Sequence, residues 1–208
     1  MKTARMIKPA FTLSALVGAS LALSACVSLG GAEPPESLLS LTPTAMAPAG
    51  SGASHNRAGE SSAIAVLTPE VPAKLDVQRV PVNVSDTEIA YLQEAVWVEK
   101  PARLFRRLLG ETLRTRGSML VLDGEDSPTV ATRYLRGSLI ELGYDAPTSS
   151  VVVSFNAILT SDDGTVTSRR FEAREEGILA EASDVGPALN RAANTLAGEV
   201  ADWAIANP

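Results

Sequence analysis

The amino-acid sequence predicts an α+β fold, a two-layer sandwich in which two main helices pack on one face of a mixed or antiparallel sheet. Three observations support this prediction. Two segments with apolar residues at helical spacing lie far apart, one starting at Pro101 and one following Asp184. Between them, three long strand-like segments follow one another and are separated by turn residues. Before the first helix, short apolar runs are bounded by prolines, which is typical of short strands.

The two helices are predicted from their end signals and their apolar stripes. The first begins at Pro101, a favoured first-turn residue, and stops before Gly117. Its apolar positions recur every three or four residues and mark the buried face: Leu104, Phe105, Leu108, Leu109 and Leu113. We expect Asp184 to cap the second helix, with Pro187 in its first turn. Its apolar stripe then runs to the end of the chain: Leu189, Ala193, Leu196, Val200 and Trp203.

Strands are predicted on both sides of the first helix. Short ones are expected at 37–42, 64–67, 80–84 and 119–122, an alternating one at 88–98, and long ones at 133–144, 150–160 and 166–178. Asp162-Asp163-Gly164 joins the last two long strands in a hairpin. Pro81 lacks a backbone N–H and therefore places its strand at a sheet edge or at a strand start.

The beginning of the chain has the layout of a secretory signal. Three basic residues precede an uncharged apolar stretch, and small residues then lead to the single cysteine, Cys26. The apolar stretch is about 14 residues long, shorter than the roughly 20 that a membrane-spanning helix needs. Leu23-Ser24-Ala25-Cys26 resembles the lipobox of bacterial lipoproteins, whose cysteine receives diacylglycerol and becomes the mature N-terminus. The alternative, an ordinary export signal with a chance cysteine, is disfavoured because all four positions match.

These signals divide the chain into three parts. Residues 1–25 are the predicted lipoprotein signal peptide, 26–37 a lipidated tether, and 38–208 a single α+β domain in which 43–62 form a disordered loop. Val27 and Ser28 follow the cysteine where enterobacterial lipoproteins retained in the inner membrane carry Asp. This favours a periplasm-facing protein anchored to the outer membrane, with the inner membrane as the alternative.

Composition limits the possible partners. Removal of residues 1–25 takes away three positive charges and no acidic residue, so the net charge falls from −6 to −9. A chain this acidic lacks the basic footprint that nucleic acids require.

With one cysteine no intramolecular disulfide can form, so the fold must depend on its core. The hydrophobic residues that can build this core make up 45% of the chain.

The sequence offers no catalytic or metal site. The single histidine, His55, lies in a stretch of small residues, and we expect it to be solvated. Ser/His/Asp and Cys/His catalysis need an ordered imidazole, so the sequence predicts neither. No Cys/His cluster for zinc exists, and the acidic residues after Leu122 lack the ligand spacing of a calcium loop. The chain also lacks a phosphate-binding glycine loop, so ATP hydrolysis would have to come from a partner. We predict no enzyme activity and no cofactor other than the lipid on Cys26.

One group of basic residues stands out in this acidic chain. Arg103, Arg106 and Arg107 lie on the first helix, outside its apolar stripe. The simple interpretation is a solvated polar helix face. The functional interpretation is a docking face for an acidic partner or for lipid headgroups.

Three segments carry a family resemblance. Ile89-Ala90-Tyr91 and Trp97-Val98-Glu99-Lys100-Pro101-Ala102-Arg103-Leu104 lead into the first helix, and Leu135-Arg136-Gly137-Ser138-Leu139 begins a long strand. Behind a lipobox and in this order, they resemble the ABC-type transport auxiliary lipoprotein family, which includes the paraquat-inducible protein C group. The resemblance covers about residues 38–206. It departs from the family where residues 88–96 carry few aromatic side chains.

The resemblance implies a noncatalytic accessory subunit. Members of the family accompany ABC permease and ATPase subunits and MCE-domain proteins, which move phospholipids or other hydrophobic molecules between membranes. The chain would dock such an assembly at the outer membrane, and a homo-oligomer is compatible with this role. The alternative from a different class is a structural lipoprotein that scaffolds envelope assembly without a link to transport.

Overall fold

The longest strand, β5 (Arg133–Asp145), is the spine of a seven-stranded mixed sheet. The computed structural model describes residues 37–52, 63–117, 119–122 and 131–207, all within the unit Pro35–Pro208. The other strands are β1 (Ala63–Val66), β2 (Arg79–Asn83), β3 (Ile89–Val96), β4 (Leu120–Leu122), β6 (Ser150–Thr160) and β7 (Val166–Glu176). A short 3-10 helix, η1 (Ala73–Leu75), lies between β1 and β2. The two helices are α1 (Pro101–Arg116) and α2 (Ala182–Ala206).

The two edges of β5 are used differently. One edge pairs with β6 along its whole length, and β6 pairs in turn with β7, so these strands form the predicted antiparallel meander. The other edge is shared, because β1 pairs in parallel with the beginning of β5 and β2 with its end. Beyond them, β4 pairs in parallel with β1, and β3 pairs antiparallel with β2. The sheet is therefore mixed, as predicted.

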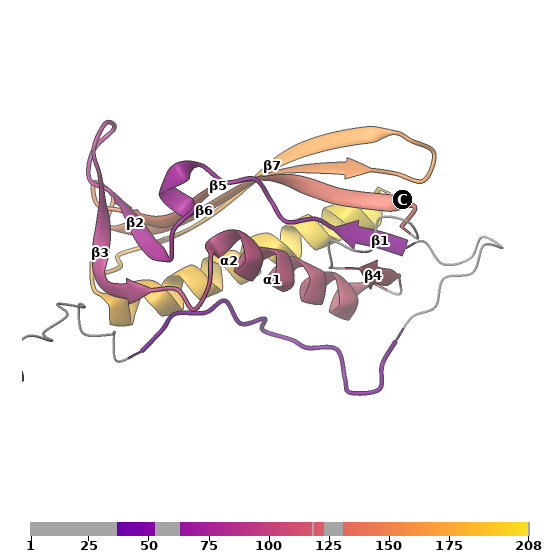
Figure 1. Cartoon of the computed structure of the whole chain (residues 1–208), viewed down its shortest axis with the longest axis horizontal. Helices are drawn as coiled ribbons and strands as arrows, with labels where there is room; N and C mark the ends of the chain where they lie inside the picture. Colours follow the sequence, from indigo (N-terminus) through magenta and orange to yellow (C-terminus); the bar gives the residue numbers. More distant parts are fainter. Residues whose placement is uncertain (1–36, 53–62, 118, 123–130, 208) are drawn as a thin grey trace, which may run out of the picture. The chain divides into compact units, whose positions relative to one another are not determined.

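Both helices cover the same face of the sheet (Figure 1). Alternate residues of β6 point to them and are fully buried: Val151, Val153, Phe155, Ala157 and Leu159. The predicted stripe of α1, from Leu104 to Leu113, is fully buried against this layer, and Phe105 meets Phe155 edge to face. On the opposite face, exposed residues such as Arg136, Asn156 and Arg170 contact solvent. The predicted two-layer α+β sandwich is confirmed.

The N-terminal strap, which we define as residues 37–52, runs along the two helices on the side away from the sheet (Figure 1). Asn190 and Asn194 of α2 accept the backbone N–H groups of Thr42 and Thr44 at 2.8 and 2.9 Å. Glu111 of α1 accepts the N–H of Ala47 at 2.7 Å. Only Leu39 pairs as a strand, in an isolated bridge to Trp97, so the predicted strand over 37–42 is wrong. Of the loop expected over 43–62, residues 53–62 lie outside the described residues.

The start of α2 and the regularity of β3 differ from prediction. The last helix begins at Ala182, with Glu181 in the capping position and no side-chain cap; Asp184 lies in the first turn and Pro187 inside the helix. In β3, the left-handed backbone of Glu94, with φ of 59°, interrupts the alternation predicted for 88–98. This irregularity turns Leu92 and Ala95 both toward the core, although a regular strand would place them on opposite faces.

Candidate functional site

The part of the chain that the structure describes contains no group of three or more His, Cys, Asp or Glu side chains able to hold a metal ion. His55 lies outside the described residues, as do Leu23, Ser24, Ala25 and Cys26 of the lipobox. Neither described helix has the length and apolar character to cross a bilayer. Two surfaces of the described residues are candidate binding sites: the basic face of α1 and a hollow beside β3.

The three predicted docking arginines lie together at the start of α1, but their surroundings differ. Arg103 and Arg107 are one helical turn apart and exposed, whereas Arg106 is half-buried. Arg107 forms an ion pair with Glu99, the residue two positions before the helix. The Nε of Arg106 is buried without a hydrogen-bond partner among the described residues. Arg103 is the member of this group that is exposed and makes no ion pair in the described ranges, so its charge is available to a ligand.

The segment before α1 adds a fourth basic residue to this region. Lys100 occupies the capping position of the helix and reaches Asp76 at 2.8 Å, with both side chains more than half exposed. Since exposed ion pairs contribute little to stability, the charge of Lys100 remains accessible to other groups. Gln78 donates to the carbonyls of Trp97 and Val98, both at 3.1 Å, which orders the connection between β3 and α1.

Two apolar residues where the strap meets the β3–α1 connection are exposed, and the sequence did not predict them as site residues. Leu38 is 52% exposed and Val98 is 48% exposed, although their chain neighbours in the Leu39–Trp97 bridge are partly buried (Leu39) and fully buried (Trp97). Backbone hydrogen bonds join the two segments, from Leu39 N–H to Val96 O at 2.7 Å and from Val98 N–H to Leu39 O at 2.8 Å. In the sequence, the nearness of Leu38 to the predicted tether was the one sign of such a role. The pairing of the Leu39 segment with residues about 60 positions later has no local sequence signature.

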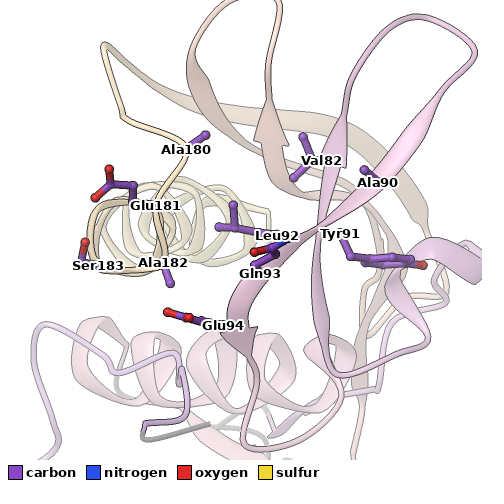
Figure 2. Close-up of a pocket in the computed structure, with 10 residues that line it drawn as sticks. All are labelled: Val82, Ala90, Tyr91, Leu92, Gln93, Glu94, Ala180, Glu181, Ala182 and Ser183. Atoms are coloured by element: carbon purple, nitrogen blue, oxygen red, sulfur yellow. The ribbon is translucent and has the colours of Figure 1, made fainter. Parts of the chain in front are cut away.

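Figure 2 shows the hollow between the edge strand β3 and the beginning of α2. Its volume is about 580 Å³. Apolar side chains of both elements line it together with carboxylates: Val82, Ala90, Leu92, Ala180, Ala182, Glu94 and Glu181. The left-handed Glu94 shapes one wall, and the uncapped first turn of α2 forms the other. The negative side chains disfavour an anionic ligand, and the hollow contains no catalytic constellation.

Comparison with known proteins decides the family. The family model described as "ABC-type transport auxiliary lipoprotein component" matches residues 41–201, from the strap to the last turns of α2. The chain belongs to this family. The resemblance seen in the sequence is thereby confirmed over nearly the whole described unit, and the family is an auxiliary transport component. No curated protein is similar enough to this auxiliary lipoprotein to count as a relative.

Solved structures share the fold of this auxiliary lipoprotein. Protein XCC0632 from Xanthomonas campestris matches with a TM-score of 0.60 and 19% identity, covering 73% of this chain and 89% of that one. An uncharacterized protein matches with a TM-score of 0.60 and 15% identity, covering 68% and 91%. A dodecameric PelC from Paraburkholderia phytofirmans gives a TM-score of 0.41 at 16% identity, covering 72% and 91%. These likenesses concern the fold alone.

Proposed function

We propose that this protein is a lipid-anchored, noncatalytic accessory subunit of an MCE/ABC-type system that transports lipids or other hydrophobic compounds between membranes. Its task is to dock the transport assembly at the outer membrane from the periplasmic side. The family match over residues 41–201 carries the proposal. The lipobox at Leu23, Ser24, Ala25 and Cys26 supports it independently, because it lies outside the matched region.

The anchor follows from the chemistry of Cys26. Two acyl chains already hold a protein stably on a membrane, and a bacterial lipoprotein carries three. The domain itself then needs no membrane-spanning element and no cofactor. Arg103, Arg106 and Arg107 remain the candidates for docking, either to an acidic partner surface or to lipid headgroups.

We expect Cys26→Ser to remove the lipid and, with it, retention in the outer membrane. Mass spectrometry of the wild-type protein should show the mass of an acylated cysteine, and membrane fractionation should place the protein in the outer-membrane fraction. The control Ser28→Ala changes a neighbouring small residue and should leave both results unchanged. A bare thiol on the mature wild-type chain, or outer-membrane retention of Cys26→Ser equal to wild type, would contradict the anchor.

Partner subunits must supply the energy of transport in this proposal, since the chain has no phosphate-binding loop. We expect an MCE-domain protein, and through it the permease and ATPase, to co-purify with the acylated protein from detergent-solubilised envelopes. An unrelated acylated lipoprotein from the same envelope is the control for nonspecific capture. Reproducible absence of an MCE-domain protein from the eluate would support an envelope scaffold instead.

A further inference from the structure

We propose that the corner of the domain where the strap begins rests on the membrane and binds anionic lipid headgroups. This membrane-facing patch consists of Leu38, Val98, Lys100, Arg103 and Arg106. The proposal rests on the lipid anchor of the proposed function and names the ligand of the same arginines. It adds an orientation: the start of α1 faces the bilayer, and the β6–β7 hairpin does not.

The path of the chain brings this corner to the membrane. Residues 27–37 form a segment of eleven residues after Cys26, and a fully extended chain of this length spans at most about 35–40 Å. The strap enters the domain at Leu39, which two backbone hydrogen bonds fasten between Val96 and Val98. Figure 1 shows where the strap begins, near the junction of β3 and α1. An acylated Cys26 therefore keeps the corner that carries the patch within about 35–40 Å of the membrane, closer than the far end of the domain needs to be.

The apolar part of the patch fits the membrane interface. Leu38 and Val98 project from two paired segments and are each about half exposed, at 52% and 48%. Apolar side chains surrounded by basic ones are the pattern by which interfacial segments bind anionic bilayers. An acidic protein surface would account for the charges of the patch, whereas a bilayer interface accounts for both its charges and its exposed Leu and Val near the tethering point.

The charge of the patch matters although the protein is acidic as a whole. In the described region Lys100 pairs with Asp76 and Arg107 pairs with Glu99, and the exposed pair of Lys100 contributes little to stability, so Lys100 can exchange Asp76 for a headgroup. Arg103 is exposed and Arg106 half-buried, and neither has an ion-pair partner among the described residues. At physiological salt the Debye length is about 8 Å, so distant acidic residues weaken the attraction of these two charges to a headgroup layer only slightly.

The test measures the depth of single positions in the acylated, full-length protein reconstituted in vesicles. Cys26 is the only native cysteine and is acylated, so Val98→Cys introduces a single reactive thiol for an environment-sensitive fluorophore. The control is Val166→Cys, an exposed apolar residue, 58% accessible, at the start of β7. Vesicles contain either phosphatidylcholine alone or phosphatidylcholine with phosphatidylglycerol, and brominated lipids quench a fluorophore that touches the acyl chains.

We expect quenching of the label at position 98 with phosphatidylglycerol present, and none at position 166. Arg103→Glu should weaken the binding of the patch to phosphatidylglycerol, read from the quenching at position 98, by about five- to twenty-five-fold. This is the effect of losing one or two favourable charge interactions, each about 1 kcal/mol, at an anionic surface. Arg170→Glu, the same charge change on the solvent face of β7, should leave quenching as in wild type. Equal quenching at 98 and 166, or no dependence on phosphatidylglycerol, would overturn the proposal.

The remaining outcomes separate this inference from the proposed function. If the protein fails to float with vesicles and carries no acyl mass, the anchor itself is wrong, and the orientation falls with it. If the protein floats but the label at 98 becomes shielded only on addition of the MCE-domain protein, the patch binds that partner. In that case the membrane assignment is overturned while the accessory role stands.

Discussion

Replacing Arg133 with Ala is expected to lower the free energy of unfolding by about 3–5 kcal/mol. Arg133 is the first residue of β5 and is buried, with 1% exposure. Its Nη2 donates to the carbonyl oxygens of Ala204 and, at 2.6 Å, Asn207 at the end of α2. The last four carbonyls of a helix lack partners within it and carry partial negative charge. The guanidinium satisfies two carbonyls at once and joins β5 to α2.

Burial lowers the pKa of Arg133, and the nearby Asp162 opposes this shift. An arginine nevertheless stays protonated over the pH range in which proteins fold, so the buried charge persists. Arg133→Ala would therefore remove the donor from the buried contact to Ala204 and from the partly buried contact to Asn207, and would leave a cavity between sheet and helix. The total stability of a typical domain is about 5–15 kcal/mol, so a loss of this size is large.

The measurement is urea unfolding of the acyl-free unit, residues 35–208, followed by tryptophan fluorescence and far-UV circular dichroism. Arg136→Ala is the matched control, because Arg136 lies on the same strand but is exposed on the solvent face. Its replacement should change stability by less than about 0.5 kcal/mol. Equal effects of the two substitutions would show that Arg133 does not hold the end of α2.

Gly137→Ala is expected to destabilise the same unit by about 2–6 kcal/mol, through two separate causes of about 1–3 kcal/mol each. Gly137 lies opposite Ala157 in the β5–β6 ladder, and its φ of 156° falls in a region that other residues rarely adopt. A Cβ atom added here would lie 2.0 Å from the carbonyl oxygen of Asn156 and 2.9 Å from the ring of Phe155. Backbone must move to relieve the first contact, because a carbonyl within the ladder has no free rotation.

Gly164→Ala separates the two causes. Gly164, in the β6–β7 hairpin, also has a positive φ of 84°, but nothing lies within 4 Å of an added Cβ. The free energy of unfolding of Gly164→Ala should therefore fall only through the backbone conformation, by about 1–2 kcal/mol. The same urea titration would measure both variants. If Gly137→Ala proved no more destabilising than Gly164→Ala, the close approach of β5 and β6 at this point would not be needed for the fold.

Much of the fold could be predicted from the sequence because the signals are local. The stripe from Leu104 to Leu113 has the helical period, and Pro101 and Gly117 mark the ends of the helix. The β6–β7 hairpin follows from Asp162-Asp163-Gly164 between two strand-like segments. The family resemblance likewise depended on short runs in a fixed order, and the match over 41–201 confirmed it.

Long-range contacts explain what could not be predicted. Residues 37–42 have a strand-like composition, but only Leu39 finds a strand partner, because Asn190 and Asn194 bind the backbone that follows. The alternation of residues 88–98 fails at Glu94, where the pairing between β2 and β3 shifts. The sharing of one β5 edge between β1 and β2 depends on the length of β5 relative to its neighbours.

The candidate site divides in the same way. By itself, the sequence determined the lipobox prediction, the acidic balance and the arginines of α1, since residue identity and spacing along one chain suffice for these. Only the tertiary structure decided that Arg107 is paired, that Arg103 has no ion pair in the described ranges, and that Leu38 and Val98 are exposed on two segments joined through Leu39. The physical reason is that exposure and ion pairing belong to groups brought together by folding. Arg133 and Arg136 illustrate this: the same residue type, three positions apart on one strand, is buried in the first case and solvated in the second.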